Sequence, residues 1–236
     1  MDMNCIWEHN GNDSLLYCID YPGAYTRGNS LDVCISKMHS ECRSYFRWLG
    51  VKIPEQIEVR VIQDASCDLE VRDADSDVLF ESEKAPLTME EYLKLKELAL
   101  KSALDFYSLF ESVPDPDRVL SVPRYTFYGQ VPNTASQMYI HTKNVNAYYF
   151  GEIDVDADNE GTIYECRKRG FEMLEQKQDF LDNPIIEGSY GEAWTLRKVL
   201  RRFIWHDRIH AKAMYRKCVR LFGKENMVNP FFFEAE

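Results

Sequence analysis

The most informative segment of the chain is Trp205-His206-Asp207-Arg208-Ile209-His210-Ala211-Lys212-Ala213-Met214. It belongs to a longer run in which apolar residues recur every three or four positions, which predicts an amphipathic helix. His206 and His210 interrupt the apolar face of this helix, and side chains four positions apart leave a helix on the same side. We therefore expect both imidazoles to point toward the protein interior. The face comprises Leu196, Val199, Phe203, His206, His210 and Ala213.

Four capping-box patterns divide the second half of the chain into helices. In each pattern a hydroxyl accepts a hydrogen bond from the third amide of the helix, while a Glu or Gln side chain reaches back to the cap. The patterns are Thr88…Glu91, Thr134…Gln137, Thr162…Glu165 and Ser189…Glu192. They predict helices at residues 89–113, 135–151, 163–182 and 190–222. Four amphipathic helices in succession indicate an up-and-down four-helix bundle.

A third histidine lies on the second predicted helix, whose apolar face runs through Met138, His141, Val145 and Tyr148. Three imidazoles from two helices are therefore expected inside the bundle. Such a set can hold one divalent cation and leave a coordination position open, as in catalytic rather than structural zinc sites. Imidazole also suits nickel, copper and iron. The spacing alone supports equally well a hydrogen-bonded or pH-sensitive core cluster, because His-x-x-x-His pairs are common on helices.

Helix order and histidine placement over residues 88–223 resemble the DinB-like metalloprotein superfamily. That family is a four-helix bundle with one histidine on the second helix and a His-x-x-x-His pair on the last. The resemblance implies that His141, His206 and His210 bind a divalent metal, foremost zinc or nickel, with iron as a further option. Many members carry a His-Arg-Gly-Gln run after the last ligand, where this chain has Ala211-Lys212-Ala213. The family's substrate contacts are therefore not carried over.

Characterised members of the family include thiol-dependent transferases and isomerases. The resemblance thus implies a low-molecular-weight thiol, such as mycothiol or bacillithiol, or another small molecule as the partner. A metal lowers the pKa of a bound thiol and supplies thiolate at neutral pH. We expect a metal-dependent transferase or hydrolase in which the histidines are ligands and not bases. The candidate pocket residues are Tyr139, Tyr148, Trp205 and Arg208.

The last predicted helix is locally basic. One interpretation is an anion site or a nucleic-acid contact; the one we favour is a solvated face that balances or pairs with acidic residues elsewhere. The net charge of −11 argues against general nucleic-acid binding, which needs a basic face. The basic residues are Arg197, Lys198, Arg201, Arg202, Arg208, Lys212, Arg216, Lys217 and Arg220.

The composition is that of a globular protein. Of the 236 residues, 45% are hydrophobic and 28% are charged, which excludes disordered and collagen-like chains. No apolar run approaches the length of a membrane span, and the beginning of the sequence shows no secretory signal. Seven cysteines without a Cys-x-x-Cys pair indicate reduced thiols. Together these features predict a cytoplasmic protein that does not engage a membrane.

The first part of the chain predicts a small α/β module. Turn residues between two apolar runs indicate a hairpin near residues 3–20. A helix is expected from its cap at Ser30 to Leu49, with Gly50 as its stop. Alternating residues predict a strand at 57–62, and a further short strand is expected at Val78–Phe80. The expected division is a module at 1–64, a junction at 65–87 and the bundle with its tail at 88–236.

The module resembles the HicB-like antitoxin fold over residues 3–64. The resemblance rests on the segment Tyr21-Pro22-Gly23-Ala24-Tyr25-Thr26-Arg27-Gly28-Asn29-Ser30-Leu31 and the helix that follows it. It implies a partial ribonuclease-H-like domain that binds protein partners and forms oligomers, including a homo-oligomer. No basic DNA-binding segment accompanies it, so a packing or dimerisation module is preferred to antitoxin activity.

The sequence thus predicts an α+β protein, with a HicB-like module followed by a DinB-like four-helix bundle. Metal-dependent chemistry at the three histidines is the leading functional hypothesis. The alternative is a non-catalytic interaction protein, in which the bundle is a scaffold and the module binds a partner. A third hypothesis is a bundle that has lost its metal and keeps buried histidines.

Overall fold

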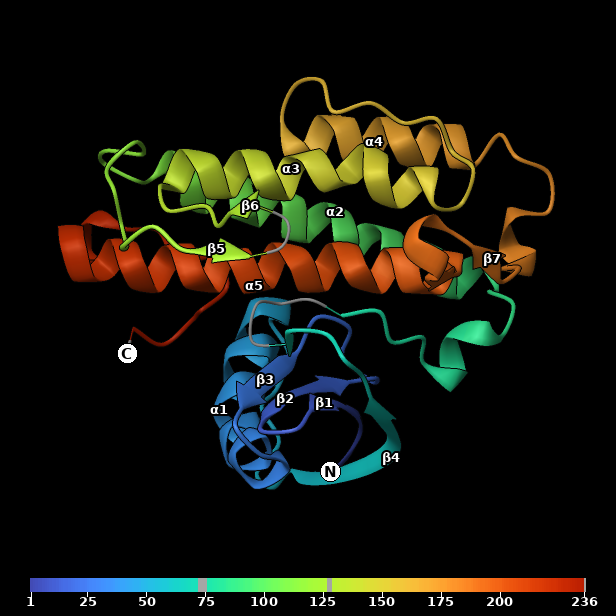
Figure 1. Cartoon of the computed structure of the whole chain (residues 1–236), viewed down its shortest axis with the longest axis horizontal. Coiled ribbons are helices and arrows are strands. Elements are labelled where there is room, and N and C mark those ends of the chain that lie inside the picture. Colours follow the sequence, from blue (N-terminus) through green and yellow to red (C-terminus); the bar gives the residue numbers. More distant parts are fainter. Residues whose placement is uncertain (72–75, 127–128, 236) are drawn as a thin grey trace. The chain divides into compact units, whose positions relative to one another are not determined.

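The computed structural model describes residues 1–71, 76–126 and 129–235. Residues 72–75 of the expected junction, and residue 236 of the expected tail, lie outside the described residues. The fold is α+β, as predicted, with the sheet near the N-terminus and most helices after it (Figure 1). The chain forms two compact units, Met1–Ser82 with Phe231–Phe233, and Glu83–Pro230 with Glu234–Glu236. None of the described helices combines the length and apolarity that crossing a membrane requires.

The first unit is a four-stranded sheet with one helix. The strand order is β3-β2-β1-β4, in which β1 is antiparallel to β2 and parallel to β4. The predicted hairpin is confirmed as β1 and β2. The unit consists of β1 (Asp2–Asn10), β2 (Asp13–Cys18), β3 (Tyr25–Gly28), α1 (Leu31–Leu49) and β4 (Glu58–Ser66).

The predicted ends of α1 are confirmed. The Ser30 hydroxyl accepts a hydrogen bond from the Val33 amide, and Gly50 adopts a left-handed φ of 68° just past the last turn. The core of the unit is rich in sulfur. Its buried residues include Met3, Cys5, Cys18, Cys34, Met38 and Cys42. None of the chain's seven cysteines, all within the described ranges, forms a disulfide.

The strand predictions beyond the hairpin were partly wrong. β4 is longer than the predicted 57–62, and β3 was not predicted. Residues 78–80 form no strand, because side chains bind their backbone in place of a neighbouring strand. The Glu8 carboxylate accepts a hydrogen bond from the Val78 amide at 3.4 Å, and the Gln63 amide donates to the Leu79 carbonyl at 3.1 Å. The short helix η2 (Glu81–Lys84) follows.

A C-terminal aromatic segment completes the first unit. Phe231 and Phe233 are buried, and the Phe231 ring lies 5.3 Å from that of Trp48 on α1. The Ser44 hydroxyl donates a hydrogen bond of 2.9 Å to the Phe231 carbonyl. Between them, Phe232 is half-exposed and has a φ of 57°, a conformation that lets both flanking rings turn inward.

The second unit contains four longer helices packed side by side (Figure 1). α5 packs on α2 and α3, and α4 also packs on α2 and α3. Phe150, Phe171 and Phe203, from three different helices, meet with ring centroids 5.1–6.2 Å apart. Gly170 permits this packing, because a Cβ there would lie 2.2 Å from the Phe150 ring. The helices are α2 (Met89–Glu111), α3 (Ala135–Gly151), α4 (Ile163–Leu174) and α5 (Leu196–Phe222).

Short elements connect these helices. Two-residue strands form two small antiparallel pairs, β5 with β6 and β7 with β8. They are β5 (Tyr125–Thr126), β6 (Gly129–Gln130), β7 (Ile186–Glu187) and β8 (Ala193–Trp194). The 3-10 helices are η3 (Phe180–Asp182), η4 (Ser189–Gly191) and η5 (Lys224–Asn226).

Two predicted caps are complete and two are not. Thr88 and Thr162 form full capping boxes. Thr134 caps α3 with its hydroxyl, but the Gln137 side chain accepts from the Asn133 amide and not from Thr134. The prediction that Ser189 caps the last helix was wrong. Tyr190 adopts a left-handed φ of 62°, and the strand β8 lies between Ser189 and the helix. The cap is Thr195, which accepts from the Lys198 amide.

Two predicted helix ends were also too late. α2 ends at Glu111, two residues before the predicted end. α4 ends at Leu174, and the left-handed φ of 55° at Asp179 prevents a helix from continuing to the predicted end at residue 182.

The basic residues of α5 are only partly solvated, which corrects the favoured interpretation. Lys198, Arg201, Arg202 and Arg208 are buried. Pairing with acidic residues does occur, since Arg201 binds Glu83 in a buried ion pair with a closest distance of 2.5 Å. α5 is therefore a central helix of its unit rather than one with a solvated basic face.

We expect Phe231→Ala to destabilise the first unit by about 3–5 kcal/mol, the usual cost of emptying a buried aromatic position. The loss of stability can be measured by urea unfolding, with hydrogen exchange of the α1 amides as the readout for this unit. Phe232→Ala is the matched control, because the Phe232 side chain is half-exposed; it should change stability by less than about 0.5 kcal/mol. Equal effects of the two substitutions would contradict the assignment of the segment to this core.

We expect Thr195→Ala to destabilise the second unit by about 1 kcal/mol, because the first turn of α5 loses the acceptor for the Lys198 amide. Ser189→Ala, at the position where the sequence pattern wrongly predicted the cap, should change the free energy of unfolding by less than about 0.5 kcal/mol. Urea unfolding measured by circular dichroism at 222 nm tests both. The reverse order of effects would show that the helix begins at the earlier position.

Candidate metal centre

Three histidines from two helices converge, as the sequence predicted. His206 and His210 lie one turn apart on α5, and His141 faces them from α3. The ring centroid of His141 is 5.2 Å from that of His206 and 4.8 Å from that of His210. One nitrogen of each imidazole lies within 4.8 Å of the other two. The cluster therefore brings one nitrogen donor from each imidazole close to the other two.

The cluster is graded from buried to exposed. His206 is buried, His210 is intermediate and His141 is exposed. The expectation that all three point into the interior is therefore corrected for His141, which lies at the solvent edge of the cluster. This grading suits a site that small molecules reach from the His141 side.

The spacing of the α5 pair fits a shared metal ion. The Nε2 atoms of His206 and His210 are 3.2 Å apart. Two imidazole nitrogens bound tetrahedrally to one zinc ion at 2.0–2.1 Å are separated by about 3.3 Å. The same distance also fits a hydrogen bond between one protonated and one bare ring nitrogen. The donor set is the type that zinc, nickel and iron accept.

The surroundings favour neutral imidazoles. Burial lowers the pKa of His206 well below its ordinary range, and the neighbouring His210, His141, Arg202 and Arg167 lower it further. Partial loss of solvent also lowers the pKa of His141. Neutral imidazole is the form that binds a metal, so the lowered pKa values of His206 and His141 favour coordination at neutral pH.

His206 has no hydrogen bond that fixes its second ring nitrogen. Its Nδ1 is buried and has no hydrogen-bond partner among the described residues. A metal-binding histidine usually donates this N–H to a carboxylate or a carbonyl. Here the ring is held by packing, with the Tyr149 ring at 5.9 Å and the Trp205 ring at 6.4 Å.

The predicted pocket residues lie in different places. Tyr148 is half-exposed and meets the edge of Trp194 at 5.9 Å. Trp205 and Arg208 are fully buried. Tyr139 turns to α2 and α4, where it stacks on Phe110 at 4.3 Å and accepts a hydrogen bond from the Ile163 amide. Burial there raises the pKa of Tyr139 to about 12.

Sequence reasoning missed Tyr149, Trp194 and the placement of Arg202. Tyr149 follows His141 by eight positions, which places it about 80° around α3, at the buried edge of the face that carries His141. The Arg202 guanidinium lies 5.2–5.6 Å from the rings of Tyr149, Trp194 and Trp205. An aromatic layer with an embedded cation therefore adjoins the buried end of the cluster.

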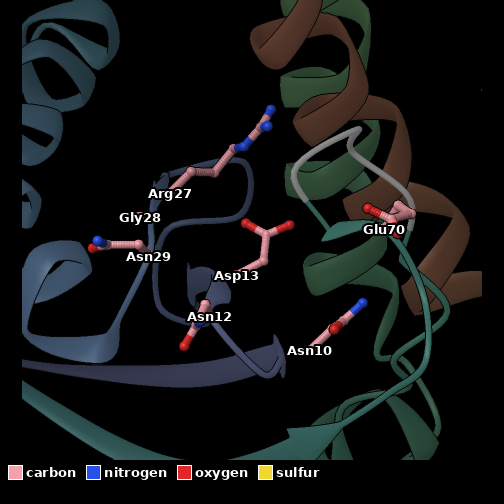
Figure 2. Close-up of a pocket in the computed structure, with 7 residues that line it drawn as sticks. All are labelled: Asn10, Asn12, Asp13, Arg27, Gly28, Asn29 and Glu70. Atoms are coloured by element: carbon pink, nitrogen blue, oxygen red, sulfur yellow. The ribbon is translucent and has the colours of Figure 1, made fainter. Parts of the chain in front are cut away.

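A pocket in the first unit is separate from this cluster. Figure 2 shows it where the β1–β2 turn approaches the end of β3, with the Asp13 and Arg27 side chains on its wall. Among the described residues that line it there is no histidine or cysteine, and none belongs to a group that could hold a metal ion. The lining residues are Asn10, Asn12, Asp13, Arg27, Gly28, Asn29 and Glu70.

Comparison of the chain with family models, with curated proteins and with solved structures finds no match in any of the three. We therefore infer the function from the geometry of the histidine cluster.

We expect His206 of the metal-free protein to take up its proton only below pH 6.5, its usual pKa, because burial disfavours the imidazolium. Between its folded and unfolded pKa the unfolded chain binds more protons, so acidification through this window should lower the stability of the fold. A ¹H–¹³C NMR titration, with the urea-unfolded chain as control, measures the shift. A native midpoint at or above 6.5 would contradict the buried placement.

Proposed function

We propose that this chain is a metal-binding protein in which His141, His206 and His210 hold one divalent ion, with the second unit as a DinB-like four-helix bundle. The observation that carries the proposal is the 3.2 Å approach of the His206 and His210 Nε2 atoms, with the His141 ring beside both. Zinc and nickel are the leading candidates, and iron is the third.

The proposed reaction class is thiol transfer or hydrolysis. A bound divalent ion lowers the pKa of a coordinated thiol or water and supplies a nucleophile at neutral pH. The chain's part is to hold three neutral donors, to keep one side of the cluster open at His141, and to exclude water at the buried His206. A low-molecular-weight thiol or another small molecule would enter from the His141 side.

Metal content provides the test. We expect about one zinc, nickel or iron ion per untagged chain, and less than about a tenth of that in His210→Ala, since two donors bind a divalent ion far more weakly than three. Elemental analysis after reconstitution with each ion measures it. His39→Ala removes an exposed histidine of α1 and serves as the matched control, which should retain the metal.

Two results would contradict the proposal. One is a wild-type chain that holds no metal after reconstitution, and the other is His210→Ala with an unchanged metal content. If metal is bound, consumption of a low-molecular-weight thiol with an electrophile should depend on it. If removal of the metal left the rate of thiol consumption unchanged, the proposed catalytic function would be contradicted.

The alternative function is a non-catalytic interaction module. The observation that favours it is β4, the last strand in the order of the sheet, which exposes Val61 and Ile62 to solvent. An exposed strand at a sheet edge can add a strand from a partner or from a second copy of the chain. Light scattering and pull-downs with Ile62→Lys would test it, and a wild-type chain without metal would make it the leading interpretation.

A further inference from the structure

The most buried of the three candidate ligands has no hydrogen bond on the ring nitrogen that faces away from the cluster. The Nδ1 atom of His206 has no hydrogen-bond partner within the described ranges, its Nε2 contacts only the neighbouring candidate ligand His210 at 3.2 Å, and aromatic rings pack around it. The direction of this ring therefore depends on the rotation of α5 about its axis. At about 6 Å from the axis, a rotation of about 10° moves a ring atom by about 1 Å. Metal–ligand distances tolerate only about 0.2 Å.

The next residue on α5 supplies a fixed point for that rotation. Asp207 projects about 100° away from His206, toward α2 and α4. Both Asp207 oxygens bind the Arg167 guanidinium of α4, with Nη2 3.0 Å from Oδ1 and Nη1 close to Oδ2. The Ser102 hydroxyl of α2 donates to Oδ2 at 2.5 Å. Both charged side chains are fully buried.

The arginine is itself held on several sides. Its Nη1 also donates to the Ala99 carbonyl of α2 at 3.2 Å, and its guanidinium lies 4.2 Å above the Phe203 ring of α5. Rotation of α5 about its axis would separate two opposite charges in a place where water cannot replace the lost partner, which is strongly unfavourable. The pair therefore resists rotation of the helix more firmly than apolar packing does.

We propose that Asp207 and Arg167 are positioning residues for the metal site, which set the rotation of α5 so that His206 and His210 face His141. The inference rests on the proposed function. A metal-binding histidine is usually oriented by a hydrogen bond to its second ring nitrogen. Here the buried ion pair, on a different side of the same helix, would orient the histidines.

A matched control lies on the same helix. Arg201 and Glu83 form a second buried ion pair, with side chains 5% and 6% exposed. It joins α5 to the η2 segment and not to α2 or α4, and it lies more than one turn before His206. Replacing this pair removes a buried ion pair of the same kind from α5 but leaves the contacts of Asp207 in place.

The experiment replaces each pair by apolar residues of similar size, so that no unpaired charge stays buried. One variant is Arg167→Met with Asp207→Leu, and the control is Glu83→Leu with Arg201→Met. Cobalt(II) is the probe, because its visible absorption reports both affinity and ligand geometry. Circular dichroism and urea unfolding confirm that each variant is folded.

We expect the Arg167/Asp207 variant to bind cobalt at least about tenfold more weakly than wild type, with a changed absorption band. The control should bind within about threefold of wild type with the same band. Unchanged binding in the Arg167/Asp207 variant would overturn the inference, and so would an equal loss in both variants, since that would indicate general loosening.

Two further outcomes are decisive. If the double variant does not fold, Ser102→Ala removes one contact to Asp207 without unpairing a charge; severalfold weaker cobalt binding would support the inference, and unchanged binding would overturn it. If the wild-type chain does not bind cobalt at all, the proposed function fails first. If the wild-type chain binds cobalt and the Arg167/Asp207 variant binds it with the same affinity, the inference fails while the proposed function stands.

Discussion

A buried ion pair between Arg167 of α4 and Asp207 of α5 constrains the whole helical unit. Both side chains are inaccessible to solvent, and the Ser102 hydroxyl of α2 joins them, so three helices meet at one carboxylate. Two charges taken out of water are tolerated only while they remain paired, and separating them costs several kcal/mol. Any shift of α5 relative to α2 and α4 must therefore preserve this contact. His206, the residue that directly precedes Asp207, projects to a different side of α5 and faces α3.

The chemistry of the unit follows from this division of α5 into two sides. One side carries a satisfied charge pair, and the other carries two imidazoles whose Nε2 atoms are 3.2 Å apart, with His141 of α3 beside them. Burial depresses the pKa of His206, which favours the neutral, metal-binding form of this imidazole. His206 lies in the buried part of the cluster, and His141 lies at its solvent-exposed edge.

Local signals in the sequence predicted much of this arrangement, and long-range packing explains what they missed. The bounds of α3 and the convergence of three histidines follow from caps and helical spacing. The cap of α5 was misplaced because Ser189 has the same local pattern as a cap, while β7–β8 pairing and the left-handed Tyr190 prevent a helix there. The role of Arg167 was not predictable, because its partner lies 40 positions away in the sequence. The same holds for the burial of Arg201, whose partner Glu83 precedes the first long helix of the unit.

X-ray absorption spectroscopy of the zinc-loaded, untagged chain counts the ligands of the ion and so tests whether the three histidines bind it. We expect a nitrogen shell at about 2.0–2.1 Å with the outer-shell scattering of three imidazoles, falling to two in His141→Ala. A shell of oxygen atoms without imidazole scattering, or sulfur at about 2.3 Å, would contradict it.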